Sequence, residues 1–234
     1  MNHSDRIAEN VASVRDRIAD AARRSGRTED AVTLVAVTKY VGAEQILPLL
    51  AAGCRVLGES RPQQLWNKAD ALAEESIEWH LIGHLQRNKV RRTLPITSMI
   101  QSGDSWRIFA AINDESARLD RPTPMLIEVN ISGEEAKGGC APDQVEPLLE
   151  KLAPLQHVQV QGLMAMGSWT RDLDTVRADF CAIRELRDRL QSVCPAGVSL
   201  DELSMGMSGD FEVGIEEGAT IVRVGSALFE GAGP

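Results

Sequence analysis

The feature that most constrains the fold is a regular alternation of short apolar runs with helical stretches along the chain. The runs predicted as strands are residues 32–38, 55–58, 79–82, 98–101, 125–131, 158–164, 202–204 and 220–224. Helical stretches are predicted at 44–52, 61–75, 86–93, 104–118, 142–153, 173–192 and 209–217. Alternating strands and helices predict a parallel sheet. Eight strands over this length predict a single α/β domain folded as a (β/α)8 TIM barrel, with a doubly wound open sheet as the alternative.

An extra helix is predicted in front of the first strand. Its apolar residues recur at helical spacing, and they are Ile7, Val11, Val14 and Ile18. Gly26 follows as a stop signal. The chain shows neither an internal repeat nor a low-complexity linker, so we expect residues 1–234 to form one domain.

Charge and cysteine usage exclude several classes of protein. The net charge of −9 argues against a general nucleic-acid binder, since neutralising phosphates needs a surplus of Lys and Arg. The sequence contains no apolar run long enough to span a bilayer and no secretion signal at its start. The four cysteines are scattered, without metal-site spacing, at Cys54, Cys140, Cys181 and Cys194. We therefore expect a cytoplasmic protein that binds neither nucleic acid nor membrane and holds no metal.

Lys39 is the first candidate functional residue. It directly follows the uncharged run 32–38, at the end of a predicted strand, and chemistry in a barrel lies at the C-terminal ends of its strands. We expect its ammonium group to be partly desolvated there, which would make the amine nucleophilic toward carbonyls. The alternative is a lysine that simply reaches solvent at a strand end.

Two Gly/Ser turns follow the last two predicted strands. Residues 204–209 read Ser-Met-Gly-Met-Ser-Gly, and Gly225-Ser226 follows the final strand. Loops at these places in a barrel often bind phosphate through backbone N–H groups, although both could be ordinary turns. With a lysine opposite, such a cradle would take an aldehyde that carries a phosphate. Pyridoxal phosphate (PLP) and the sugar phosphate of a class I aldolase both fit that description.

Arg223 bears on the choice between these two ligands. It lies two residues before Gly225, so both should point toward the mouth or lumen of the barrel. A guanidinium that faces a pyridine nitrogen would keep that nitrogen unprotonated, because two facing donors repel. The cofactor would then be a poor electron sink, which limits carbanion chemistry.

Seven sequence blocks then match a known family, in order, over nearly the whole chain. They are AVTK (36–39), LGES (57–60), WHLIGHLQRNK (79–89), EVNISGEEAKGG (128–139), GLMAM (162–166), LSMGMS (203–208) and RVGS (223–226). Together they resemble the pyridoxal-phosphate homeostasis protein family, single-domain relatives of the alanine racemase N-terminal domain. The resemblance implies a fold-type III barrel and PLP bound as a Schiff base to Lys39.

The resemblance also implies the other site residues. Phosphate contacts are expected from Ser204, Gly225 and Ser226, with Arg223 facing the pyridine nitrogen. Asn130 and Met164, which belong to two of the blocks, are predicted as further cofactor-binding residues. The chain departs from the family at Ser60, where Asn is usual, and at Gly103, so contacts to the cofactor ring at these two positions are expected to differ.

Turnover would need a second acid–base group besides the lysine, since racemisation moves a proton on both faces of the substrate. The chain has one tyrosine, Tyr40, and as the neighbour of Lys39 it is expected to point to the opposite side. His80 and His84 are the nearest other candidates, and each has a structural alternative as a hydrogen-bonded residue. A chain that ends at Pro234 is expected to lack the second domain of a racemase.

We therefore predict a PLP carrier in intracellular PLP homeostasis, without a catalytic residue or robust turnover. It is expected to be a monomer that contacts PLP-dependent apo-enzymes transiently. An amino-acid racemase, or another PLP-dependent enzyme with an unidentified second base, is the first alternative. A class I aldolase that uses Lys39 on a sugar phosphate is the second.

Overall fold

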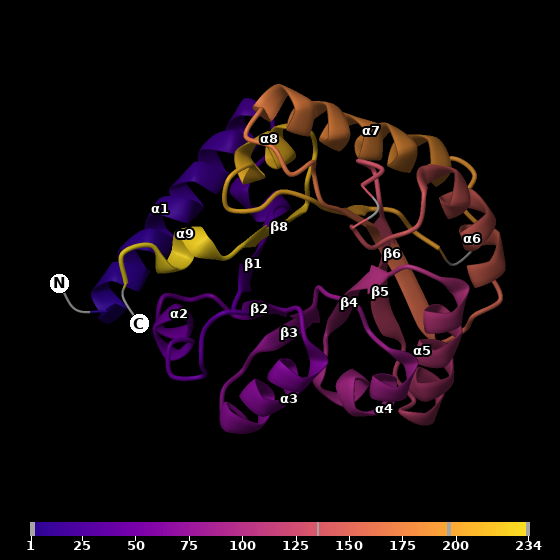
Figure 1. Cartoon of the computed structure of the whole chain (residues 1–234), viewed down its shortest axis with the longest axis horizontal. Helices are drawn as coiled ribbons and strands as arrows, with labels where there is room; N and C mark the ends of the chain where they lie inside the picture. Colours follow the sequence, from indigo (N-terminus) through magenta and orange to yellow (C-terminus); the bar gives the residue numbers. More distant parts are fainter. Residues whose placement is uncertain (1–2, 135, 196–197, 233–234) are drawn as a thin grey trace.

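A computed structural model describes residues 3–134, 136–195 and 198–232. Within this part of the chain, eight parallel strands close a barrel in sequence order, and β1 pairs with β8 (Figure 1). The strands are β1 (Thr33–Val37), β2 (Val56–Glu59), β3 (Glu78–Leu81), β4 (Met99–Gly103), β5 (Thr123–Val129), β6 (Val158–Ala165), β7 (Glu202–Ser204) and β8 (Ile221–Val224). The closed order confirms the barrel and excludes the open sheet. Glu135, in the fourth family block, and Pro234 lie outside the described residues.

Helices surround the barrel (Figure 1). The α-helices of the described residues are α1 (His3–Arg24), α2 (Leu47–Ala51), α3 (Pro62–Ala71), α4 (Val90–Thr93), α5 (Trp106–Arg118), α6 (Val145–Leu152), α7 (Leu173–Gln191), α8 (Phe211–Glu216) and α9 (Ser226–Phe229). Short 3-10 turns lie at η1 (Glu29–Ala31), η2 (Arg87–Lys89), η3 (Leu94–Ile96) and η4 (Pro142–Gln144). The stretch predicted as one helix over 86–93 is thus a 3-10 turn followed by a single α-helical turn. The prediction did not include α9.

The extra N-terminal helix is confirmed, and it buries the predicted stripe. Ile7, Val11, Val14 and Ile18 are all nearly inaccessible, and burying such side chains stabilises the fold by about 1.5–3 kcal/mol each. The helix packs on α8 and α9, beside which it lies in Figure 1. Asn10 of α1 donates to the carbonyl oxygen of Glu230 at 2.9 Å. The helix therefore fastens the C-terminal end of the chain to the barrel.

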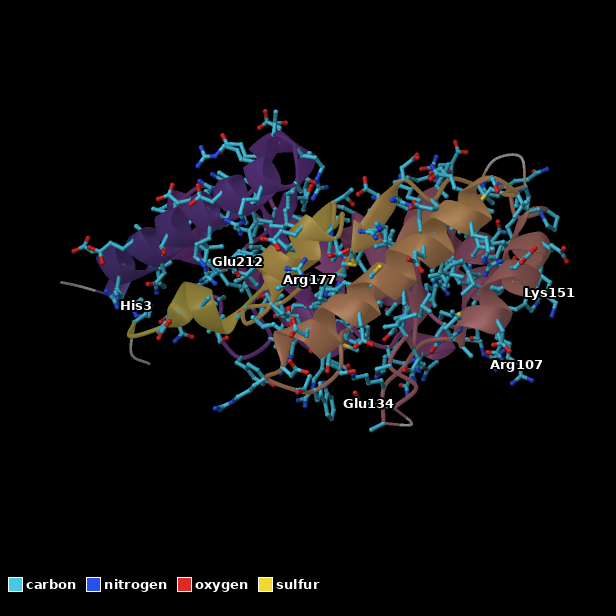
Figure 2. All side chains as sticks on the ribbon, turned by 90° about the horizontal axis from the view of Figure 1, so that it is seen from above. His3, Arg107, Glu134, Lys151, Arg177 and Glu212 are labelled. Atoms are coloured by element: carbon cyan, nitrogen blue, oxygen red, sulfur yellow. The ribbon has the colours of Figure 1, made fainter. Side chains whose placement is uncertain are left out.

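Ion pairs join α1, α8 and α7 on the outside. Arg17 Nε of α1 lies 2.7 Å from Glu212 Oε1 of α8, and Arg177 Nη1 of α7 lies 2.8 Å from Glu217 Oε1 just after α8. Figure 2 shows Glu212 and Arg177 at these contacts between the helices. Each partly exposed pair contributes roughly 0–1 kcal/mol. They orient α8, which follows the β7 loop, more than they stabilise the fold.

The barrel interior changes from apolar to polar toward the C-terminal ends of the strands. Its apolar layer consists of Val35, Met99, Leu126, Met164 and Ile221. Side chains two residues further along three of these strands share the same face, and they are Gln101, Glu128 and Arg223. All three are buried. Buried polar groups need partners, so this end of the barrel is where a functional site is expected.

Candidate functional site

A cavity of about 550 Å³ opens at the C-terminal end of the barrel. Residues at or just after six strands line it, among them Lys39, Ser60, Ile82, Met166, Ser208 and Gly225. A second cavity of about 460 Å³ adjoins it and shares Lys39, Tyr40, Val41 and Ser60. A cavity of about 450 Å³ also lies near the N-terminal ends of β1 and β2. That cavity has no lysine in its lining, whereas the mouth cavity combines an amine with small polar loops, so we place the site at the mouth.

Lys39 and Tyr40 occupy a turn beyond the end of β1, and the structure corrects two expectations about them. The Lys39 side chain is exposed instead of partly desolvated, and its Nζ lies 4.9 Å from the centre of the Tyr40 ring. Tyr40 is 89% exposed and lines the same cavity as Lys39, not the opposite side. The reason is that β1 ends at Val37, so the alternation of a strand does not extend to these two residues.

Another part of the cavity wall is built by Ser208, Gly209, Gly225 and Ser226, after β7 and β8, and β8 pairs with β1, so this part lies beside Lys39 and not across the barrel from it. Ser208 Oγ accepts hydrogen bonds from the backbone N–H groups of Gly225, at 3.1 Å, and Ala227, at 3.3 Å. These bonds tie the loop after β7 to the loop after β8. The result is one concave surface of hydroxyl groups and backbone, which suits an anion.

Ser204, which was predicted to contact phosphate, does not reach this cavity. It is fully buried, its Oγ donates to Gln101 Oε1 at 2.7 Å, and it is absent from the lining of the cavity. Ser204 is the last residue of β7 and points into the barrel, whereas Ser208 lies four residues further along the rising loop. Ser208 belongs to the same sequence block, so a serine in this loop could be found from the sequence but the particular one could not.

Arg223 is buried and lines the cavity. Its Nη1 donates to the Ser204 carbonyl oxygen at 2.8 Å and to Ser204 Oγ at 2.6 Å, and its Nη2 donates to the Ala165 carbonyl oxygen at 2.9 Å. Burial lowers the pKa of Arg223 to about 10, and the nearby carboxylates Glu128 and Asp210 oppose that shift. The guanidinium is therefore still charged at neutral pH and held in one orientation.

A hydrogen-bond chain continues from Arg223 across the barrel. Ser204 donates to Gln101, whose Nε2 lies 2.9 Å from His80 Nδ1. Burial lowers the pKa of His80 to about 4. The imidazole is thus neutral at pH 7, and its Nδ1 accepts the Gln101 amide proton. This series of hydrogen bonds holds Arg223 from the side away from the cavity, and Ser204, Gln101 and His80 do not line the cavity.

The remaining predicted residues are divided between the cavity and its surroundings. Met164 and Ser60 line the cavity, but Asn130 does not. Asn130 donates from Nδ2 to the Glu134 carbonyl oxygen at 2.9 Å and so holds its own loop. His84 also lies outside the lining, with its Nδ1 3.1 Å from Asp104 Oδ2.

Gly103 is explained by packing, not by a cofactor contact. It lies in β4, outside the cavity lining. A methyl group at this position would lie 2.8 Å from the Leu126 carbonyl oxygen and closer still to the Phe109 ring. The space that a larger side chain would need is therefore taken by Phe109 of α5.

Part of the apolar wall was not recognised from the sequence. Phe229 lines the cavity from the last residue of α9. The sequence signal for α9 is weak because the helix has four residues. Within the part of the chain that the structure describes, we find neither a group of His, Cys, Asp and Glu residues suited to a metal nor a helix long and apolar enough to cross a membrane.

The fold and the site together define a class of protein. Residues 3–232 match the family model of the alanine racemase N-terminal domain. The barrel with a lysine after β1 and an anion cradle after β7 and β8 therefore belongs to the class of barrels that are built like this domain.

Relatives that match over the whole barrel narrow the class to one family. The pyridoxal phosphate homeostasis protein of Aquifex aeolicus is 41% identical over 221 residues, which cover 94% of this chain and 96% of the relative. The solved structure of an unknown protein from Bifidobacterium adolescentis has a TM-score of 0.89 and 37% identity, with 97% and 95% covered. PipY of Synechococcus elongatus, solved with PLP bound, has a TM-score of 0.84 and 33% identity, with 95% and 99% covered. The chain belongs to the pyridoxal phosphate homeostasis protein family, as its sequence blocks predicted.

Proposed function

We propose that this protein binds pyridoxal 5'-phosphate at the barrel mouth, as a Schiff base on Lys39, and acts as a carrier in intracellular PLP homeostasis. The observation that carries the proposal is that one cavity is lined both by Lys39 and by the cradle of Ser208, Gly225 and Ser226. The printed names of the relatives and the PLP-bound structure of PipY support the same ligand.

The residues of the cavity fit the chemical groups of PLP. The cofactor supplies an electrophilic aldehyde, and the Lys39 nitrogen would add to its carbon while the carbonyl oxygen leaves as water. The hydroxyl groups of Ser208 and Ser226 would hold the phosphate beside Gly225, whose backbone N–H donates to Ser208 and orients it. Arg223, charged and fixed by Ser204, would face the ring nitrogen as a donor and keep it unprotonated. A volume of about 550 Å³ lies in the range of small-molecule sites.

We propose a carrier because neither histidine near the barrel mouth supplies a second acid–base group beside Lys39. Proton transfer on both faces of a substrate needs two positioned acid–base groups. His80 is buried behind Gln101, and His84 is paired with Asp104, so neither histidine lines the cavity. The exposure of Lys39 and Tyr40 leaves the amine accessible from outside. Such access suits hand-over of the cofactor to an apo-enzyme during a transient contact.

One observation favours the racemase as a second candidate. Tyr40 lines the same cavity as Lys39, so a phenol group is present beside the amine. This candidate predicts that the protein exchanges the α-proton of an amino acid with solvent at an enzyme-like rate. It also predicts that Lys39→Ala abolishes the exchange and Tyr40→Phe reduces it.

Borohydride reduction followed by peptide mapping tests the proposed function. The purified protein incubated with PLP should be yellow, and reduction should leave a pyridoxyl group on Lys39. Lys39→Ala should lose the colour and the adduct, whereas Lys89→Ala, which removes a lysine from the loop after β3, should keep both. An adduct on another lysine, or none, would overturn the proposal. Rapid α-proton exchange that Lys39→Ala abolishes would replace the carrier with the racemase.

A further inference from the structure

A buried lysine next to the site has no role in the proposed function so far. Lys68 of α3 is 8% exposed and lines the smaller cavity, together with Lys39. It forms an ion pair with Glu59 Oε1, at the end of β2. Glu59 is completely buried. Burying two charges is costly unless they are paired and hydrogen-bonded, so this pair needs an explanation.

Both members of the pair bind the same residue, Thr38. Lys68 Nζ donates to the Thr38 carbonyl oxygen at 2.7 Å. Thr38 Oγ1 donates to Glu59 Oε1 at 2.8 Å. The Thr38 backbone N–H donates to the Gly58 carbonyl oxygen at 3.0 Å. Every polar group of Thr38 is thus held by β2 or α3.

Thr38 immediately precedes Lys39, and this connection transmits the contacts to the amine. The carbonyl oxygen of Thr38 and the backbone nitrogen of Lys39 belong to one planar peptide unit. A hydrogen bond to that oxygen therefore fixes the orientation of the peptide plane between Thr38 and Lys39, and with it the direction in which the Lys39 side chain leaves the backbone. Because β1 ends at Val37, this oxygen is bound by Lys68 and by the Val41 backbone N–H, at 3.0 Å, and not by a neighbouring strand.

We propose that Lys68 and Glu59 are positioning residues that clamp Thr38 and thereby place the Lys39 amine for Schiff-base formation. This inference rests on the proposed function of Lys39. Glu59 Oε2 has no hydrogen-bond partner among the described residues. The carboxylate is therefore held through Oε1 alone, by Thr38 and Lys68. The clamp has one charge of each sign and leaves the anion cradle untouched.

The test separates placement of the amine from binding of the rest of the ligand. We would titrate each variant with PLP and with 4'-deoxypyridoxine 5'-phosphate, which has a methyl group in place of the aldehyde. The analogue reports the phosphate cradle and the ring contacts, whereas PLP also reports the bond to Lys39. A misplaced amine should raise the dissociation constant of PLP about tenfold or more, because the bond to Lys39 then contributes at least about 1.4 kcal/mol less to binding. The dissociation constant of the analogue should change little.

Thr38→Val and Thr38→Ser form the matched pair of variants. Valine keeps the branched shape of threonine and removes the hydroxyl group, so the affinity for PLP should fall relative to the affinity for the analogue. Serine keeps the hydroxyl group and should restore the wild-type ratio. The double variant Lys68→Met/Glu59→Gln removes the ion pair and the bond from Lys68 to the Thr38 carbonyl oxygen without stranding a buried charge, and the ratio of PLP to analogue affinity should fall as in Thr38→Val.

Leu65→Ala is the control for a general loss of packing. Leu65 is fully buried on the same helix, so this change should destabilise α3 without removing a contact to Thr38. Its ratio of PLP to analogue affinity should stay at the wild-type value. An unchanged ratio in Thr38→Val, or the same change in Leu65→Ala as in the clamp variants, would overturn the inference. Failure of the wild-type protein to form an adduct on Lys39 would instead overturn the proposed function.

Discussion

Arg223 Nη1 donates to Ser204 Oγ at 2.6 Å, and this bond joins the cation in the cavity wall to a hydroxyl group outside the cavity. Ser204 in turn donates to Gln101. A hydroxyl group has one proton to donate, and Ser204 donates it to Gln101, so in this arrangement Ser204 has no proton to donate to a phosphate. We therefore expect Ser204 to act on a ligand through the orientation of Arg223.

Separate substitution of Ser204 and Ser208 by alanine should distinguish a serine that orients Arg223 from a serine that binds phosphate. Ser204→Ala removes a partner from both Arg223 and Gln101, so the free energy of unfolding should fall by about 1–3 kcal/mol. Ser208→Ala removes a hydroxyl group from the cradle and should weaken PLP binding with a smaller loss of stability. Chemical denaturation and PLP titration of both variants measure the two effects. Equal loss of PLP affinity with unchanged stability in Ser204→Ala would contradict this division.

Gly103→Ala should destabilise the barrel. The added methyl group would lie 2.8 Å from the Leu126 carbonyl oxygen and against the Phe109 ring. Overpacking of this kind costs about 1–3 kcal/mol. Thermal unfolding should show the loss, and Phe109→Leu should recover part of it in the double variant because the ring is the group in the way. A Gly103→Ala protein of wild-type stability would instead show that β4 shifts freely.

His80 should make the protein less stable in acid. Its pKa is about 4 in the fold, below the ordinary value of 6.5, so the unfolded state binds more protons between these two pH values. The contribution of His80 to the free energy of unfolding is therefore fully present above pH 6.5, and about 3 kcal/mol of it is lost as the pH drops to 4. Denaturant unfolding at a series of pH values measures this slope. His80→Gln cannot titrate, so its slope in this range should be shallower than that of the wild-type protein.

Ionisation of Glu128 should lower the stability of the protein as the pH rises, which is opposite to the effect of His80. Burial, reinforced by Asp104, raises its pKa to about 6 from 4.5, against the opposing effect of Arg223 and His84. The folded state therefore binds more protons between pH 4.5 and 6, and stability falls by about 2 kcal/mol as the pH rises through this window. Glu128→Gln should remove that penalty and be more stable than the wild-type protein at pH 7. A less stable variant at pH 7 would show that the carboxylate is instead needed as a counter-ion of Arg223.

The barrel and the position of Lys39 at its mouth could be predicted from the sequence because both depend on local patterns. Apolar runs of strand length alternate with amphipathic helices, and Lys39 follows the first of these runs. The orientation of Tyr40 could not be predicted in this way. Strand alternation applies only up to Val37, and the turn after it depends on contacts from β2 and α3.

Ser204 and Phe229 show two further limits of the sequence. Whether a serine faces the barrel or the loop depends on where β7 ends, and β7 has three residues. Phe229 reaches the cavity from α9, whose position depends on packing against α1, more than two hundred residues earlier in the chain. Neither contact has a local sequence signal.

The packing of α1 on α9 leads to a prediction about the cradle. Asn10 Nδ2 donates to the carbonyl oxygens of Leu228, at 3.2 Å, and Glu230, at 2.9 Å. α9 starts at Ser226, which lines the cavity, so these bonds hold the helix that carries one wall of the cradle. Asn10→Ala should raise the dissociation constants of PLP and of inorganic phosphate together, since the cradle loosens while Lys39 stays in place. Asn67→Ala, on the outside of α3, is the matched control and should change neither constant. Weaker PLP binding with unchanged phosphate binding in Asn10→Ala would show that α1 does not act through the cradle.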